Sequence, residues 1–294
     1  MAKSGLDARI LCLTLALTPR IGSRTITRIL SRNDLLGVTP DTFWSLSMQT
    51  LVEEYRLTQS QADEWVGRRA SLRDEAKRLC DKLDQFGVQM FTPADALYPA
   101  LLEEMNPDPP GVLFTYGNEK LLESQTFTVM SSRNSAPAAL DLMEKCAEEG
   151  VLAGEILVAG FGTPEYERAA VVPLRWGSPR ILCADRGLFV ALGESLKEEP
   201  FRAARLWRYQ FDATTDLAVS SINPEKGYHI DANRKRDHLV AGLSKRLDFV
   251  AVNPGGNMEK LARNALKAGR AVRISDHFLG AREWTRYGAK MIEL

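Results

Sequence analysis

The chain has 294 residues, of which 45% are hydrophobic and 26% charged, so it can bury a sizeable core in one or two domains. Lys plus Arg and Asp plus Glu each number 38, which excludes a global field that would draw the chain to nucleic acid or to an anionic membrane. Any basic site must therefore be local.

The apolar segments of the sequence are short. No stretch approaches the roughly 18 apolar residues that a membrane span needs. The apolar stretch from Ile10 to Leu17 is not followed by a small-residue cleavage site, so it fits a buried helix better than a signal peptide. We therefore expect a cytoplasmic protein with no membrane partner.

The cysteines argue against a metal or redox site. Their positions, far apart in the sequence, are Cys12, Cys80, Cys146 and Cys183. This spacing lacks the close pairs typical of zinc ligands or a redox motif and predicts buried free thiols in a reducing compartment. We expect no metal and no cofactor.

Residues 1 to 90 are predicted to be helical, with apolar residues at intervals of three and four and almost no strand pattern. In the stretch "LTPRIGSRTITRIL", Pro19 ends one helix and Gly22 precedes the next, which Ser23 is expected to cap. This turn resembles a helix-hairpin-helix, whose backbone amides can hold a phosphate; a plain helical hairpin is the alternative. We predict an accessory domain over residues 1–90, of the SAM or helix-hairpin-helix type.

After Gly87 the pattern changes, and we predict a second domain over residues 91–294. Its expected strands are the apolar runs "GVQMFTP", Val112–Tyr116, "FTVMSS", "ILVAGFG", "RILCAD", "LAVSS", "FVAVN" and "AVRIS". The intervening helices are expected at about 136–149, 164–175, 232–244 and 257–268. Short apolar runs that alternate with helices predict an α/β fold: a Rossmann-like, mostly parallel sheet with helices on both faces.

Three loops of this domain have residues suited to phosphate. Ligands of such sheets bind beyond the carboxyl ends of the strands. One loop is Ser131–Ser135, which brings hydroxyls and a guanidinium; the second is the glycine-rich Ala159–Thr163; the third is Pro254–Asn257, whose double glycine allows close backbone approach at a helix start. The second loop is followed by two acidic residues, Glu165 and Glu167.

A basic segment, "NRKRDHLVAGLSKRLD" from Asn233 to Asp248, precedes the third loop. A charge run of this kind is either a solvated face or a phosphate-facing edge, and its place beside the glycine loops favours the edge. The predicted phosphate- and nucleic-acid-binding residues are Ser132, Arg133, Asn134, Gly160, Gly162, Arg236, His238, Gly255, Gly256 and Asn257. We assign no catalytic residue, because a Ser-His-Asp set, a metal cluster and a well-placed carboxylate pair are not evident.

The order of several short motifs resembles the DNA-processing protein A (DprA/Smf) family over almost the whole chain. The motifs are Leu97-Tyr98-Pro99, Pro109-Pro110-Gly111-Val112-Leu113, Ser132-Arg133, Ala159-Gly160, Arg236 with Ala241-Gly242-Leu243-Ser244, Ala268-Gly269-Arg270-Ala271-Val272 and Tyr287-Gly288-Ala289-Lys290-Met291-Ile292. The resemblance implies single-stranded DNA binding through a basic phosphate-binding cleft, in DNA uptake, recombination or the response to foreign DNA. It also implies a recombinase or other DNA-processing partner. We expect a homodimer.

The sequence departs from the family pattern around the cleft. The stretch "FGTPEYERAA" stands where the family carries Gly-Ile-Asp and a histidine, and Arg236-Asp237-His238 stands where Arg-Asn-Arg is expected. Two alternatives therefore stay open: a scaffold whose pocket has decayed, and a sensor or hydrolase of a small nucleotide. The Pro254-Gly255-Gly256 turn is similar to that of the lysine-decarboxylase-like (LOG) nucleotide hydrolases, with Glu259 as the nearest glutamate. A nucleotide pocket would need a carboxylate near the ribose, for which Glu165 and Glu167 are the candidates.

Overall fold

The computed structural model of the chain describes residues 2–105, 108–207, 209–276 and 280–293. The chain forms two compact units, Met1–Tyr98 with Asp108–Phe114 and Pro99–Pro107 with Thr115–Leu294. Of the helices in the described part, none is long and apolar enough to cross a membrane.

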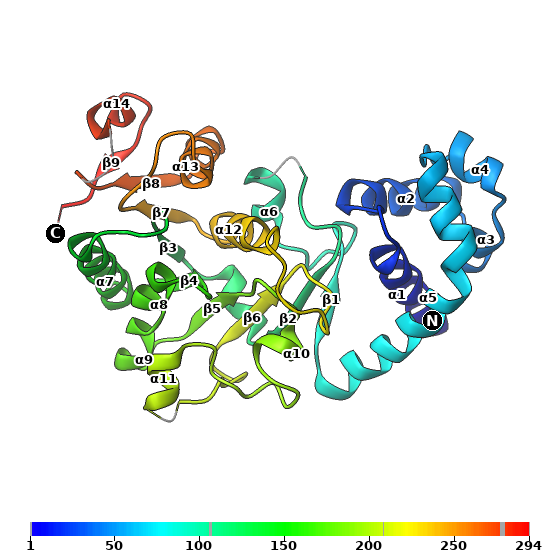
Figure 1. Ribbon diagram of the computed structural model, residues 1–294, viewed down its shortest axis with the longest axis horizontal. Helices are drawn as coiled ribbons and strands as arrows, with labels where there is room; N and C mark the ends of the chain where they lie inside the picture. The colour runs from blue at the N-terminus through cyan, green and yellow to red at the C-terminus, as the bar shows by residue number, and fades with distance from the viewer. Residues whose placement is uncertain (1, 106–107, 208, 277–279, 294) are drawn as a thin grey trace. The chain divides into compact units, whose positions relative to one another are not determined.

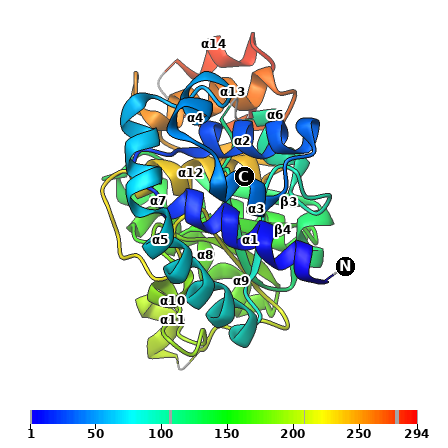
Figure 2. The ribbon, with the colours of Figure 1, turned by 90° about the vertical axis from the view of Figure 1, so that its right-hand side faces the viewer.

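The first unit is built from helices, as the periodicity predicts. They are α1 (Ala2–Leu17), α2 (Ser23–Leu36), α3 (Pro40–Ser45), α4 (Met48–Glu53) and α5 (Gln59–Phe86), and the short strand β1 (Gln89–Phe91) follows. Helices α1 and α5 pack side by side (Figures 1 and 2). Helices α3, α4 and α5 begin after Thr39, Ser47 and Thr58, whose hydroxyls accept a backbone N–H from the first turn.

The turn between α1 and α2 differs from the predicted one in its cap. Helix α2 begins at Ser23, and the capping position is occupied by Gly22, which has no side chain. The expectation that the Ser23 hydroxyl caps this helix was therefore wrong. The chain reverses at Arg20, whose φ of 65° lies in the left-handed region, and the Thr25 N–H donates to the Gly22 carbonyl oxygen at 2.9 Å.

An aromatic cluster holds the core of the first unit. The rings of Trp44 and Trp65 stack with centroids 5.0 Å apart, and Phe43 meets both Trp65 and Tyr55 edge-on at 5.4 and 5.2 Å. All four rings are buried, and the Tyr55 hydroxyl donates to Asn33 Oδ1 at 2.7 Å. Such contacts contribute about 0.5–1.5 kcal/mol per pair beyond the burial of area.

The second unit alternates strands and helices. Its elements are α6 (Ala100–Met105), β2 (Leu113–Gly117, which begins in the first unit), the 3₁₀ helix η1 (Glu119–Glu123), β3 (Thr126–Met130), α7 (Pro137–Leu152), β4 (Ile156–Gly160), α8 (Pro164–Ala170), α9 (Val172–Trp176), β5 (Arg180–Cys183), α10 (Leu188–Ala191), α11 (Arg202–Leu206), β6 (Leu217–Ser220), α12 (Ala232–Gly242), β7 (Arg246–Phe249), α13 (Asn257–Lys267), β8 (Ala271–Ile274), α14 (Ala281–Thr285) and β9 (Lys290–Met291). The strand expected at "FVAVN" begins three residues earlier, as β7.

The strand order explains where a ligand site can form. From β2 the order is β2-β6-β5-β4-β3-β7-β8-β9, and each neighbouring pair from β6 to β9 is parallel. The chain runs outward from β3 to β6 and then returns to the other side of β3. Because parallel crossovers are right-handed, this reversal puts α7 and α8 on one face and α12 and α13 on the other (Figure 1). The predicted Rossmann-like fold is confirmed.

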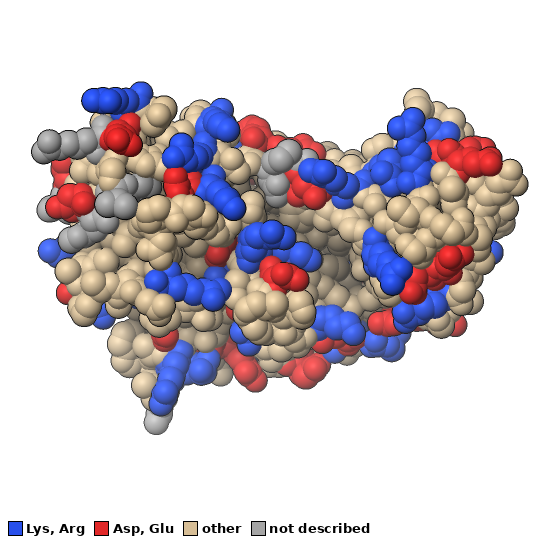
Figure 3. Space-filling model, turned by 45° about the horizontal axis from the view of Figure 1, so that its top comes forward, with Lys and Arg blue, Asp and Glu red and all other residues tan. Residues whose placement is uncertain are grey.

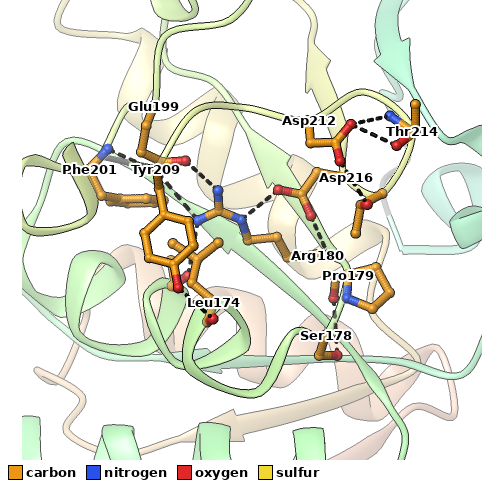
Figure 4. A network of polar contacts seen from close by, with 12 residues as sticks. Leu174, Ser178, Pro179, Arg180, Glu199, Phe201, Tyr209, Asp212, Thr214 and Asp216 are labelled. Atoms are coloured by element: carbon orange, nitrogen blue, oxygen red, sulfur yellow. Dashed lines mark hydrogen bonds and ion pairs between the residues drawn. The ribbon is translucent and has the colours of Figure 1, made fainter. Parts of the chain in front are cut away.

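A buried arginine fixes the amino edge of this sheet (Figure 4). The guanidinium of Arg180, at the start of β5, is fully buried and donates to Asp216 at 2.9 Å and to Glu199 at 2.5 Å. The guanidinium lies over the Phe201 ring, with Cζ 5.7 Å from the ring centroid. The three charged side chains tie β5 to the chain before β6 and to the segment between α10 and α11.

Candidate functional site

A pocket of about 570 Å³ opens at the carboxyl edge of the sheet. Loops after β3, β4 and β5 form it together with the segment that leads into α12. It is lined by Arg133, Asn134, Ser135, Leu140, Gly162, Thr163, Pro164, Glu165, Asp185, Arg186, Tyr228 and Asn233. This volume suits a ligand of nucleotide size.

The loop after β3 brings Arg133 to the pocket. Its shape is set by Asn134, with a left-handed φ of 61°, and by the Ser131 and Ser135 hydroxyls, which lie 2.7 Å apart. Arg133 is exposed and, within the described residues, has no hydrogen bond or ion pair. Ser132 is turned the other way, because its Oγ accepts the Asn253 N–H at 2.9 Å.

The glycines after β4 accommodate the protein's own side chains. A Cβ on Gly160 would lie 2.6 Å from Arg236 Cδ and 2.9 Å from the Tyr166 ring. A Cβ on Gly162, whose φ of 94° already favours glycine, would lie 2.7 Å from Asp185 Oδ2. Gly162 lines the pocket, whereas Gly160 lies against the buried arginine behind it.

Arg236 is a buried residue of α12, although the sequence predicted a phosphate contact. It is 1% exposed. Its guanidinium donates to Asp237 Oδ1 at 2.8 Å and to the Phe161 carbonyl oxygen at 2.7 Å, and it lies 3.7 Å from Asp185. The guanidinium is thus satisfied inside the protein, and we withdraw it as a direct phosphate ligand. Its geometry makes it a support for the loops after β4 and β5.

His238, two residues along the same helix, is half-buried. Burial lowers the pKa of its imidazole, so the side chain is neutral at pH 7. A neutral imidazole adds no positive charge for a phosphate, which weakens the predicted role of His238.

The double glycine before α13 is engaged within the protein. Gly255 has a φ of 74°, and its N–H donates to the Glu259 carboxylate, while the Gly256 N–H donates to the Asn253 carbonyl oxygen at 3.1 Å. Asn257 donates from Nδ2 to Asp237 at 3.1 Å. A carboxylate therefore occupies the place where the sequence predicted a phosphate, and this turn does not line the pocket.

The three predicted loops nevertheless share one edge of the sheet. Ser132 joins the first loop to the third, and the Arg236–Asp237 pair joins the second to Asn257. The chain reversal between β3 and β7 is where such folds commonly bind ligands. Here that position is closed by internal hydrogen bonds, and the open pocket lies one strand further, over β3 to β5.

The charges that line the pocket are balanced. Arg133 and Arg186 are opposed by Glu165 and Asp185, both of which are buried. Lys and Arg are also interspersed with Asp and Glu on the face of the molecule drawn in Figure 3. Within the described residues, no group of three or more His, Cys, Asp and Glu side chains could hold a metal ion. Inside the pocket, attraction for a phosphate thus comes from Arg133 and Arg186.

Sequence reasoning missed three polar or charged lining residues. Asp185 and Arg186 directly follow β5, so their position at the carboxyl end of a predicted strand was a signal that could have found them. Tyr228 comes from the long segment between β6 and α12, which has no periodicity to place it. Its ring is 48% exposed, lies 6.0 Å from the Arg186 guanidinium, and its hydroxyl is hydrogen-bonded to Asn233.

The fold and the pocket define an α/β protein of the Rossmann-like class with an open pocket at the carboxyl edge of its parallel sheet. The family model of DNA recombination-mediator protein A matches residues 89–174, which include β3, β4 and the first two loops of the pocket. This match, together with the fold that the chain shares with two solved structures of DNA processing protein A, confirms the predicted resemblance to the DNA-processing protein A family.

Two solved structures share the fold. DNA processing protein A from Streptococcus pneumoniae is 18% identical, with a TM-score of 0.70 over 95% of this chain and 92% of that one. The protein of the same name from Helicobacter pylori, described for its single-stranded DNA binding mode, is also 18% identical, with a TM-score of 0.53 over 71% of this chain and 92% of that one. A search of the curated proteins finds no match.

Proposed function

We propose that the chain binds single-stranded DNA through the pocket at the carboxyl edge, in DNA uptake, recombination or the response to foreign DNA. The observation that carries the proposal is Arg133, an exposed guanidinium that has no partner among the described residues and lies at a pocket of nucleotide size. Arg234 and Lys235, also exposed, follow pocket residue Asn233 in the first turn of α12. These cations offer contacts for successive phosphates of a strand.

The relatives support a nucleic-acid ligand over other anions. The family model covers both Arg133 and Glu165, and the Helicobacter pylori relative is described as a single-stranded DNA binder. The half-exposed Tyr228 ring adds the kind of aromatic platform that single-strand binders use for bases. Ser132, Asn134 and Gly162 stay in the proposed site as loop residues that shape it.

A nucleotide sensor or hydrolase is the second candidate, and one observation favours it. Glu165, which was named from the sequence as a candidate carboxylate for a ribose, does line the pocket, whereas Glu167 accepts the Ala203 N–H on the other side of α8.

The experiment that separates the two candidates has two parts. Fluorescence anisotropy of a labelled 15-nucleotide strand is measured at low salt, and nucleoside monophosphates are incubated with the protein and analysed for free base. Our proposal predicts binding that weakens with salt and no release of base. Release of base without strand binding would replace it with the hydrolase.

We further propose a cytoplasmic homodimer that hands single-stranded DNA to a recombinase, and an accessory role for the helical domain of residues 1–90. Light scattering at several concentrations tests the dimer, and limited proteolysis tests the domain. Cleavage near residue 90 that yields two stable, folded fragments supports a separate domain over residues 1–90. Cleavage at many sites through α1 to α5 would count against it.

A further inference from the structure

Glu165 is a buried carboxylate with unused hydrogen-bonding capacity that lines the pocket. The residue is 4% exposed, and its Oε1 accepts one hydrogen bond, from the Ser135 N–H at 3.2 Å. Within the described residues no hydrogen bond or ion pair reaches its Oε2. Glu165 Oε2 does not belong to the fully enclosed side-chain atoms that lack a partner, so it is open to the pocket and can accept a hydrogen bond from a ligand.

Asp185, the other acid of the pocket, differs in this respect. Its Oδ1 accepts from Arg186 Nε at 2.7 Å, and its Oδ2 lies 3.7 Å from Arg236. Both oxygens thus face guanidinium groups of the protein. Asp185 is therefore paired within the protein, whereas no ion pair to Glu165 is found among the described residues.

A ring and a cation complete the surroundings of Glu165. Tyr228 offers a half-exposed aromatic ring in the same pocket, and the Arg186 guanidinium lies near that ring. Arg133 supplies a cation that is unpaired within the described part of the chain. An aromatic ring, an acceptor and a cation match the base, the base edge and the phosphate of one nucleotide. A sugar hydroxyl would use the acceptor but not the ring.

We infer that the pocket holds one nucleotide whose base stacks on Tyr228 and donates N–H groups to Glu165, which makes Glu165 a specificity-determining residue for guanine. Guanine carries two neighbouring donors, N1–H and the N2 amino group, on one edge. Thymine has a single N–H between two carbonyl oxygens, which a carboxylate repels. The inference rests on the proposed nucleic-acid binding, and it adds which base the pocket prefers.

The test compares strands of twelve thymines with strands that carry one central guanine, inosine, adenine or cytosine. Wild-type protein should bind the guanine strand about tenfold more tightly than the all-thymine strand, as expected for a hydrogen bond to a charged group. Inosine, which lacks the amino group, should fall between them. Glu165→Gln keeps an oxygen for the Ser135 N–H but loses the charge, so it should abolish the preference while the strands still bind.

Glu167→Gln is the matched control, since it removes the same charge from the same helix outside the pocket, and it should keep the preference. Strands that bind with no base preference, or an unchanged preference in Glu165→Gln, would overturn the inference and leave the proposed function standing. Failure of every strand and of free dGMP to bind would overturn both.

Free nucleotides identify the source of the ligand. Competition by dGMP but not dTMP, lost in Glu165→Gln, upholds the base assignment even if strands bind poorly, and it then points to a free nucleotide. Equal preference for GMP and UMP over their deoxy forms would show that Glu165 binds the sugar hydroxyl, which contradicts the assignment.

Discussion

The second unit buries one arginine at each edge of its sheet, and the two differ in what surrounds them. Arg180 at the amino edge is enclosed by Glu199, Asp216 and Phe201 (Figure 4), and it does not line the pocket. Arg236 at the carboxyl edge is bonded to Asp237 and to the Phe161 carbonyl, directly behind pocket residues Gly162 and Asp185. The same chemistry therefore holds the fold at one edge and lies behind the pocket at the other.

The largest effect is expected from breaking the ion pairs of Arg180 with Glu199 and Asp216 at the amino edge. Arg180→Met should leave two buried carboxylates without their cation and lower the free energy of unfolding by about 3–5 kcal/mol. Urea denaturation measures the loss. Adding Glu199→Gln and Asp216→Asn to the same chain should restore much of it, and strand affinity of the folded protein should not change. A loss below about 1 kcal/mol would mean that this network does not hold the sheet edge.

An intermediate effect is expected at Gly160, which packs against the buried Arg236 at the carboxyl edge. Gly160→Ala would place a methyl group 2.6 Å from Arg236 Cδ, and the side chain is pinned by its hydrogen bonds and cannot move freely. We expect a loss of about 1–3 kcal/mol in stability together with weaker strand binding. Gly154→Ala, at an exposed left-handed turn after α7, is the control that tests strain without this contact. It should lower stability but not affinity.

A smaller effect concerns pH. Because the folded pKa of His238 is lowered below 6.5, the unfolded chain binds more protons than the folded one between 6.5 and that lower value. The contribution of the neutral imidazole is thus fully present above pH 6.5 and is lost as the pH falls through this window. The difference in unfolding free energy between wild type and His238→Gln should shrink on acidification. A difference independent of pH would show that His238 titrates normally.

The sequence was sufficient for strands β1 to β8, because they are apolar runs between amphipathic helices, whereas the two-residue strand β9 was not predicted. The sequence led to a wrong prediction of which basic side chains face a ligand. Arg236 shares the helical face of Leu239, Val240 and Leu243, all of them buried, so its spacing indicated an inward side chain that the charge run concealed. At Gly255, the glutamate four residues later supplies the anion that we assigned to a ligand. The place of Tyr228 depends on tertiary contacts of a long loop and could not be read locally.

The most direct measurement of the central claim is the salt dependence of strand binding for Arg133→Ala. Removing one phosphate contact should reduce the slope of log affinity against log salt by about one unit, while stability stays within about 0.5 kcal/mol of wild type. Lys267→Ala, an exposed charge at the carboxyl end of α13 and outside the pocket, should leave the slope unchanged. Equal slopes for wild type and Arg133→Ala would contradict a phosphate contact at this pocket.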